Sequence, residues 1–421
     1  MTRLRRAGQQ TFRSLETPNY RKYLVGQIIS ASGSWVQQTA LTWLVVRMTH
    51  GNGFAVGSVI ALQFFPVLIG GAWAGVLADR LDKRRVLVAT STGAAVCAAV
   101  MGALVLGDVI QLWMVYVLAA SFGIAAALDT PARRSFVTEL VPDHHAANAM
   151  SLNSSVFTAA RIIGPFVAAV LIATAGIGWC FMVNAASFGA VIVALVTMDL
   201  HAINPAAPVP RERGQLTAGL RYVRNHRALR TTLLLTAIIG TLSFNFQVTI
   251  SLMARKVFNG DAGTFALLLM LMSFGAVIAS LYVAHREHVT TRFVIMCALV
   301  LGVLMLAAAT VSSIVVFAIV LVPMGASSIA FLSSAGALAQ SRAEPEYRGR
   351  VAALFAVAFI GSTPIGAPII GGISQLFGPR SGLVVGGVTA LVAGGLALRA
   401  LNAHVADRAA ADPPPAATAP A

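Results

Sequence analysis

The chain has 421 residues, of which 57% are hydrophobic and only 11% are charged, and its mean hydropathy is +0.79. A soluble fold of this length cannot bury so much apolar surface, so soluble classes of protein are excluded. The formal net charge of +15 comes from 30 Lys and Arg residues against 15 Asp and Glu residues. Since no basic run is interleaved with aromatic residues as in a nucleic-acid groove, no nucleic-acid partner is predicted.

Apolar runs of about 20 residues recur along the whole chain, and this is the length of an α-helix that crosses a bilayer. Only helices satisfy their own backbone hydrogen bonds in lipid at this length. The sequence therefore predicts an all-α membrane protein. Its twelve transmembrane helices are expected near residues 22–46, 55–78, 86–107, 112–131, 148–175, 178–199, 230–254, 262–284, 292–311, 314–339, 350–376 and 381–402.

Polar segments divide these spans into two groups of six. A basic N-terminal arm covers residues 1–21, and the longest polar connection covers residues 200–229. This linker separates an N-terminal half (22–199) from a C-terminal half (230–403), and its stretch "LTAGLRYVRNH" predicts a short basic helix on the membrane surface. The Pro- and Ala-rich end of the chain, 404–421, is predicted to be a disordered tail.

The two halves repeat some of each other's features. Pro142 and Pro345 lie in charged loops 203 residues apart, and Pro165 and Pro368 lie in the following helices, again 203 residues apart. Two parallel six-helix repeats with a site between them near the bilayer midplane are typical of alternating-access transporters. The expected fold is therefore two pseudo-symmetric halves around a central cavity.

The positions of Lys and Arg predict the orientation. Most of them fall in the N-terminal arm, in the 200–229 linker and in loops on the same side of the predicted bundle. Because cytoplasmic loops carry the excess of Lys and Arg, both termini are expected in the cytoplasm of a multi-pass protein of the cell's inner membrane.

The loop between the second and third spans, "GVLADRLDKRR", concentrates charge in a chain that has little of it. It resembles the signature loop of the major facilitator superfamily, whose general form is G-x-L-A-D-R-x-G-R-R. The resemblance covers about residues 15–403 and departs at Asp82, where the family has its second glycine. It implies the major facilitator fold and a conformational latch made of Gly75, Asp79, Arg80, Arg84 and Arg85.

A physical reason for such a latch is the position of Asp79 at the C-terminal end of a helix, where the helix dipole disfavours a carboxylate. In the family its partners are the N-terminus of the eleventh span and nearby arginines. Charge-assisted contacts of this kind are expected to hold the two halves together while the cavity faces outward. The alternative is a plain positive loop whose acidic residues only lower its charge.

The segment from Asp129 to Gly176 resembles the drug and siderophore exporter branch, which includes the enterobactin exporter and macrolide-efflux proteins. Gly164 and Pro165 resemble part of the helix-bend motif in the fifth span of antiporters, where they permit a bend and close packing. The arginine found in the fourth span of proton-coupled drug exporters is missing here. Its absence puts the usual proton relay in doubt.

Two charged residues within the predicted spans are candidates for a role in transport. Arg161 lies about 20 Å from the inner surface at 1.5 Å per residue, where an arginine is costly unless it faces a wet cavity or a partner. It is predicted to meet substrate or a coupling group, the alternative being a paired arginine that only holds helices together. Asp129 lies near the inner end of the fourth span. It is either a proton-linked carboxylate or, as we favour, a structural partner of Arg133 or of the charged loop.

Further candidates for the transport cavity are amide and aromatic side chains in spans that line the cavity in the family fold. They are Gln37, Gln38, Asn153, Asn245, Gln247, Phe64 and Phe244. Each of them alone can equally serve helix packing. As a set they predict a mostly neutral cavity that suits a small amphipathic organic molecule.

Other chemistry is not indicated. None of the three lysines follows a glycine in a phosphate-binding loop, so nucleotide-driven transport by this chain is not predicted. The scattered cysteines, Cys97, Cys180 and Cys297, form no disulfide or zinc pattern. The sequence predicts neither an enzyme nor a bound metal or cofactor.

The leading hypothesis is a secondary exporter of a drug or siderophore, working as a monomer among membrane lipids and driven by an ion gradient, with the proton as first candidate. The alternatives are an importer on the same fold and a non-transporting membrane protein, such as a receptor or an acyltransferase.

Overall fold

The computed structural model describes residues 12–203, 215–286 and 289–411. For residues 72–76, 78–80, 215–216 and 404–411 it describes only the helical backbone. Within these ranges every regular element is a helix, which confirms the predicted all-α class.

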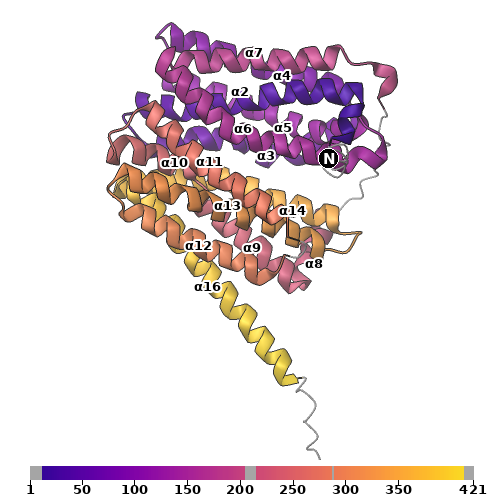
Figure 1. Cartoon of the computed structure of the whole chain (residues 1–421), viewed down its shortest axis with the longest axis vertical. Coiled ribbons are helices and arrows are strands. Elements are labelled where there is room, and N and C mark those ends of the chain that lie inside the picture. Colours follow the sequence, from indigo (N-terminus) through magenta and orange to yellow (C-terminus); the bar gives the residue numbers. More distant parts are fainter. Residues whose placement is uncertain (1–11, 204–214, 287–288, 412–421) are drawn as a thin grey trace, which may run out of the picture.

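The N-terminal half contains six long helices that run back and forth between two sides of the molecule (Figure 1). They are α2 (Pro18–Met48), α3 (Gly53–Arg80), α4 (Lys83–Leu106), α5 (Leu112–Glu139), α6 (Ala146–Thr174) and α7 (Ile177–Val196). Short turns join them, with η1 (Arg13–Glu16), η2 (Asp143–His145) and η3 (Leu200–Ala202) at the end that carries the N-terminus. We call this end of the molecule the linker side and the opposite end the far side.

The C-terminal half packs beside the first and also has six spans (Figure 1). Four are single helices: α11 (Ala262–Ala284), α12 (Thr291–Thr310), α13 (Ile314–Arg342) and α16 (Pro379–Ala411). The other two are each built from successive pieces: α9 (Arg227–Leu242), α10 (Phe246–Leu252) and the π-helical turn η4 (Met253–Val257), then α14 (Arg348–Ile360) and α15 (Thr363–Phe377).

Eleven spans in the described ranges are long and apolar enough to cross a membrane. The remaining long helix, α2, has the length but carries many polar side chains, including Gln27, Gln37 and Gln38, and so falls short by composition. The predicted twelve spans therefore match the structure when α2 is counted.

The seventh and eleventh spans are broken, whereas the sequence predicted one continuous helix for each. The α9 helix ends where the backbone N–H of Ser243 bonds to Ile239, and the Asn245 side chain donates to the carbonyl of Thr241 at 2.7 Å. In the eleventh span, Pro364 lies in the first turn of α15 and lacks the N–H that would continue α14. The two breaks adjoin, because a Cβ on Gly366 would lie 1.7 Å from the Thr241 carbonyl oxygen.

The last helix is longer than predicted. The α16 helix continues to Ala411, into the segment expected to be a disordered tail. Alanine is the strongest helix former, and this stretch is rich in it. Residues 412–421 of the predicted tail and residues 1–11 of the predicted arm lie outside the described residues.

The predicted linker helix is α8 (Gln215–Asn225). Its Tyr222 ring stacks on Tyr347 with 4.1 Å between ring centroids. The Tyr222 hydroxyl accepts a hydrogen bond from the backbone N–H of Glu344 at 3.1 Å. These contacts attach the linker helix to the connection between α13 and α14.

Asp82, the departure from the signature loop, has a local structural role. Its carboxylate accepts the backbone N–H of Arg85 at 3.1 Å and caps the N-terminus of α4. We expect Asp82→Ala to lower the free energy of unfolding by about 0.5–2 kcal/mol, and Asp82→Gly by only a few tenths. Denaturant titration of the purified protein in detergent measures both. Asp82→Asn is the control, since asparagine keeps the cap; a loss as large as that of alanine would show that charge, not capping, matters.

Candidate functional site

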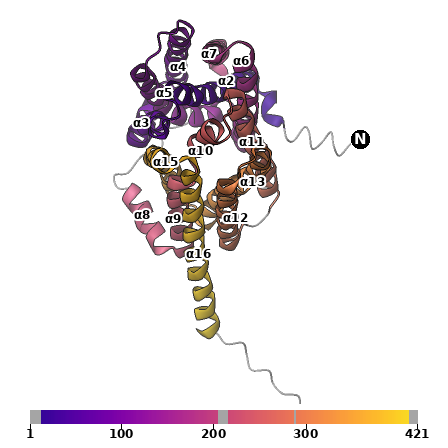
Figure 2. The same ribbon diagram turned by 90° about the vertical axis from the view of Figure 1, so that its left-hand side faces the viewer.

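On the far side the two halves are in direct backbone contact. A Cβ on Gly57 of α3 would lie 2.2 Å from the carbonyl oxygen of Ala367 in α15, and one on Gly371 would lie 2.1 Å from that of Gly53. Only glycine permits helices to approach so closely. Viewed from this side, α3, α10, α11 and α15 meet at the junction of the halves (Figure 2).

Side chains complete the closure of the far side. The Gln38 side chain of α2 donates to Gln63 of α3 at 3.1 Å and to Gln247 of α10 at 2.9 Å. The rings of Trp43 and Phe265, from α2 and α11, stack with centroids 5.8 Å apart. Both Gln38 and Trp43 thus contact the opposite half, so that α2 contributes to the contact between the halves on the far side.

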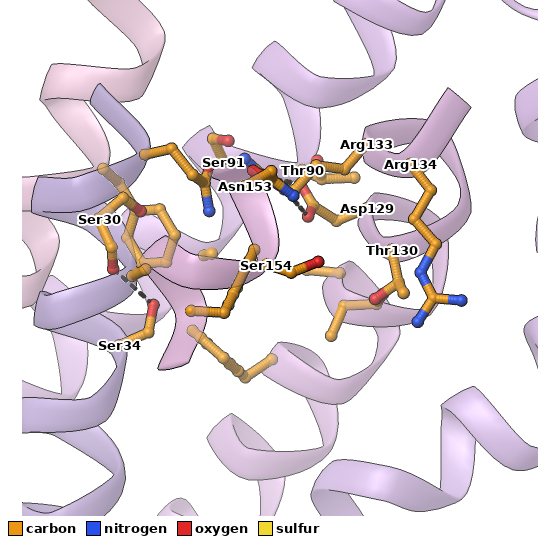
Figure 3. A pocket seen from close by; sticks show the side chains of 18 of the residues that line it. Ser30, Ser34, Thr90, Ser91, Asp129, Thr130, Arg133, Arg134, Asn153 and Ser154 are labelled. Atoms are coloured by element: carbon orange, nitrogen blue, oxygen red, sulfur yellow. Dashed lines mark hydrogen bonds and ion pairs between the residues drawn. The ribbon is translucent and has the colours of Figure 1, made fainter. Parts of the chain in front are cut away.

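A pocket of about 470 Å³ lies within the N-terminal half, and several of its lining residues, such as Arg133 and Arg134, lie near the linker-side ends of their helices. Figure 3 shows the side chains that line it. Side chains from α2, α4, α5, α6 and α7 line it. Its polar lining consists of Gln27, Ser30, Ser34, Thr90, Ser91, Asp129, Thr130, Arg133, Arg134, Asn153 and Ser154, and its apolar lining includes Phe122, Phe157 and Phe188. The volume and mixed lining suit a small amphipathic molecule.

An ion pair occupies one side of this pocket. The Arg133 guanidinium donates to both carboxylate oxygens of Asp129, at 2.6 and 2.7 Å, one turn apart on α5. Arg133 also donates to the side chain of Gln27 on α2, and Thr90 on α4 donates to Asp129 at 3.0 Å. Asp129 is therefore paired with Arg133, one of the two structural partners that the sequence suggested. It also lines the pocket, so a role in coupling stays a prediction.

Two polar atoms in the pocket wall are buried without a hydrogen-bond partner among the described residues. They are the Oδ1 atom of Asn153, in a residue 7% exposed, and the hydroxyl oxygen of Ser91, in a residue 1% exposed. Buried polar atoms are almost always hydrogen-bonded, because an unpaired one loses its hydration without compensation. Both residues line the pocket, so a small rotation of either side chain would let a ligand or water satisfy its free oxygen.

Arg161 extends the pocket face of α6 toward the membrane centre. Ser154 and Phe157 line the pocket. Arg161 lies seven residues after Ser154 and four after Phe157, so it shares their face of the helix. Its guanidinium carbon lies 5.1 Å from the centroid of the Trp35 ring on α2. This is a cation–π contact, and among the described side chains Arg161 has no carboxylate partner.

The predicted pair of Gly164 and Pro165 positions this contact. Both residues are buried in α6, which stays one continuous helix through Pro165. A Cβ on Gly164 would lie 2.2 Å from the Cβ of Trp35. Glycine here lets α6 pack directly on α2, which brings Arg161 against Trp35.

The other predicted cavity residues lie in several places. Gln38, Asn153 and Gln247 lie at the pocket or at the far-side closure. Gln37 does not join them: it is 5% exposed and accepts a hydrogen bond from Asn184 of α7 at 2.7 Å, inside the N-terminal half. Consecutive helix residues point about 100° apart, so Gln37 and Gln38 face different neighbours.

In the C-terminal half, the predicted aromatic residue Phe244 lies in a cluster with Phe246, Phe331 and Phe359, whose ring centroids are 5.4, 6.2 and 5.3 Å from its own. Asn245 is buried at the break of the seventh span. Phe64 of the N-terminal half is half-buried against the main core.

Of the predicted latch residues, the side chains of Gly75, Asp79 and Arg80 lie outside the described residues. Arg84 donates to the carbonyls of Leu195 and Val196 at 2.5 and 3.1 Å, at the C-terminal end of α7. Arg85 pairs with Asp82 at 3.5 Å. These contacts stay within the N-terminal half. The predicted latch would join the two halves when the linker side is closed. The structure has the far side closed instead, so the latch stays a prediction.

The sequence did not single out Trp35, Gln63, Thr90 or Ser91. A signal for Trp35 existed, because this aromatic residue lies in a span that is unusually rich in polar residues, among them Ser34 and Gln38. The hydroxyls of Thr90 and Ser91 were two adjacent polar groups in an apolar span. Nothing in the sequence placed that span beside Asp129. Among the described residues, no three His, Cys, Asp or Glu side chains group as metal ligands.

Comparison with known proteins agrees with this architecture. The family described as "Transmembrane secretion effector" matches residues 9–420. The staphyloferrin A transporter of Staphylococcus aureus is 26% identical over 251 residues, which are 59% of this chain and 62% of that protein, less than two thirds of its length. Macrolide efflux protein A of Streptococcus pyogenes is 22% identical over 366 residues, 85% of this chain and 89% of that protein.

Among solved structures, a bacterial homolog of the human lysosomal transporter Spinster, in an inward-facing and unoccupied conformation, superposes with a TM-score of 0.71. It is 13% identical and the match covers 93% of this chain and 98% of that one, so that it supports the fold. The family match extends over nearly the whole chain, and the fold is that of two six-span halves. The chain belongs to the transmembrane secretion effector family of the major facilitator superfamily and is a multi-pass membrane protein.

Proposed function

We propose that the protein is a secondary active exporter of small amphipathic organic molecules, of the drug or siderophore kind, that works by alternating access. One observation carries the proposal: a polar and aromatic pocket lies toward the linker side, while backbone and side-chain contacts between the halves close the far side. This is the arrangement expected of the state that loads substrate from one side only.

The substrate class is supported by the lining and by the relatives. Hydroxyl, amide and phenyl groups share the pocket, which favours an organic molecule with both polar and apolar parts. Relatives that the chain resembles include a staphyloferrin A transporter and a macrolide efflux protein. No catalytic step is part of the proposed mechanism.

The linker side is proposed to face the cytoplasm, with both termini inside and the protein in the cell's inner membrane as a monomer. Arg84, Arg133 and Arg134 lie at this side, as does the basic helix α8, in accord with the positive-inside rule. In this orientation the pocket opens toward the cytoplasm and transport runs outward.

The driving force is proposed to be an ion gradient, with the proton as first candidate. Inverted membrane vesicles, which expose the cytoplasmic side, should accumulate substrate when a proton gradient is imposed and continue to do so without ATP. A protonophore should abolish accumulation. Accumulation only in right-side-out vesicles would identify an importer, and dependence on sodium or on ATP alone would contradict proton coupling.

A further inference from the structure

The charges along the pocket and its continuation do not balance. Asp129 and Arg133 neutralise each other as a bidentate pair. Arg134 of α5 also lines the pocket, and Arg161 lies on α6 beyond the pocket residues of that helix. Neither arginine has an ion-pair partner among the described side chains. Arg134 is an exposed residue of the pocket wall, whereas Arg161 is half-buried and lies beyond the pocket lining, further along α6.

Of the two, Arg161 is the more constrained. It lies well inside a span, where a guanidinium without water or a counter-charge is strongly disfavoured. The Trp35 ring stabilises it in part, but a cation–π contact neutralises no charge. The close packing of Gly164 on Trp35 keeps this ring beside the α6 face that carries Arg161.

The residues around these two arginines indicate which other chemical groups a ligand would need. The Trp35 ring lies against Arg161, and the rings of Phe122 and Phe157 line the pocket. The unpaired Asn153 Oδ1 atom accepts a hydrogen bond, so it calls for a donor on the ligand. The required molecule has an acidic group, an aromatic or apolar body and at least one donor.

We infer that the substrate is an amphipathic organic anion, whose acidic group is held by Arg161 and whose ring lies against Trp35 and Phe157. This inference rests on the proposed transport function and adds the sign of the substrate's charge. It excludes lipophilic cations as good substrates, because each would meet Arg134 at the pocket wall and Arg161 beyond it, with no free carboxylate among the described lining side chains.

The test uses two dyes with the same xanthene skeleton and opposite charge: fluorescein, at a pH where it is fully ionised, and a cationic rhodamine methyl ester. Binding of each to the purified full-length protein is followed by fluorescence anisotropy. We expect saturable binding of fluorescein and binding of the rhodamine ester at least about tenfold weaker, the scale of one charge-assisted contact.

Variants locate the effect at Arg161. Arg161→Gln should weaken fluorescein binding by roughly 10- to 100-fold, and Arg161→Lys should restore part of it, since lysine keeps the charge but not the planar fork. Arg221→Gln is the matched control: it removes one charge from the exposed face of α8 and should leave binding unchanged. Thermal unfolding of each variant shows that it is folded.

Equal or tighter binding of the rhodamine ester, no saturable binding of fluorescein, or an unchanged fluorescein affinity in a folded Arg161→Gln variant would overturn the inference. If Arg161→Gln does not fold, Arg161→Lys and the dye comparison in the parent protein decide. Failure of the proposed function appears differently, as binding without accumulation in inverted vesicles.

Discussion

Gly57→Ala should open the far side, shifting the protein out of the conformation described here. The added methyl would lie 2.2 Å from the carbonyl oxygen of Ala367 and 2.9 Å from the Cα of Pro368, and backbone atoms of the opposite half cannot move aside singly. Overpacking of this kind costs roughly 1–3 kcal/mol. Because only the closed far side contains the contact, the equilibrium between the two conformations should shift by roughly 5- to 150-fold.

Spin labels on cysteines that replace Phe54 and Phe377, exposed residues at the far-side ends of α3 and α15, measure this change. The free cysteines Cys97, Cys180 and Cys297 are first replaced by serine. The distance distribution between the labels should gain a longer component in the Gly57→Ala protein.

Two controls separate this effect from general destabilisation. Gly70→Ala lies on the same helix with no atom within 4 Å of the new methyl, and should leave the distances unchanged. Gly275→Ala clashes at 1.9 Å with Val322, but within the C-terminal half, and should lower stability without opening the far side. Unchanged distances in a folded Gly57→Ala protein would contradict the assigned closure.

Removing either partner of the Asp129–Arg133 pair should destabilise the protein by about 3–5 kcal/mol, because it leaves the other charge buried and unpaired. The side chains are 20% and 10% exposed, and the pair joins α5 to Gln27 of α2 and Thr90 of α4. Arg133→Gln and Asp129→Asn are therefore each expected to lower the denaturant midpoint. The double variant should recover much of the loss, since neither charge remains.

The exposed pair of Asp82 and Arg85 serves as the control, with side chains 52% and 86% exposed. Arg85→Gln should change stability by at most about 1 kcal/mol. The measurement also decides between the two readings of Asp129. An Asp129→Asn protein of normal stability that has lost the response to a proton gradient would identify a coupling carboxylate and contradict the structural role.

Much of the fold follows from the sequence, because it depends on short-range properties. The length of an apolar run decides whether a helix can cross a bilayer, and this needs no knowledge of neighbouring helices. The all-α membrane class was accessible in this way, and the basic stretch in the linker predicted the short helix α8. The breaks in the seventh and eleventh spans were not, because Pro, Gly and Asn within a span are tolerated or disruptive according to what packs beside them.

For the site, the sequence by itself determined that Arg161 and Asp129 are exceptional, because a charge inside a span needs a reason wherever it lies. Only the tertiary structure decided what those reasons are: an ion pair for Asp129 and the Trp35 ring for Arg161. It also separated Gln37 from Gln38, which are adjacent in sequence yet face α7 and the opposite half. The physical reason is that a helix fixes the angle between its own side chains, whereas the helix that each side chain meets depends on how all twelve spans pack.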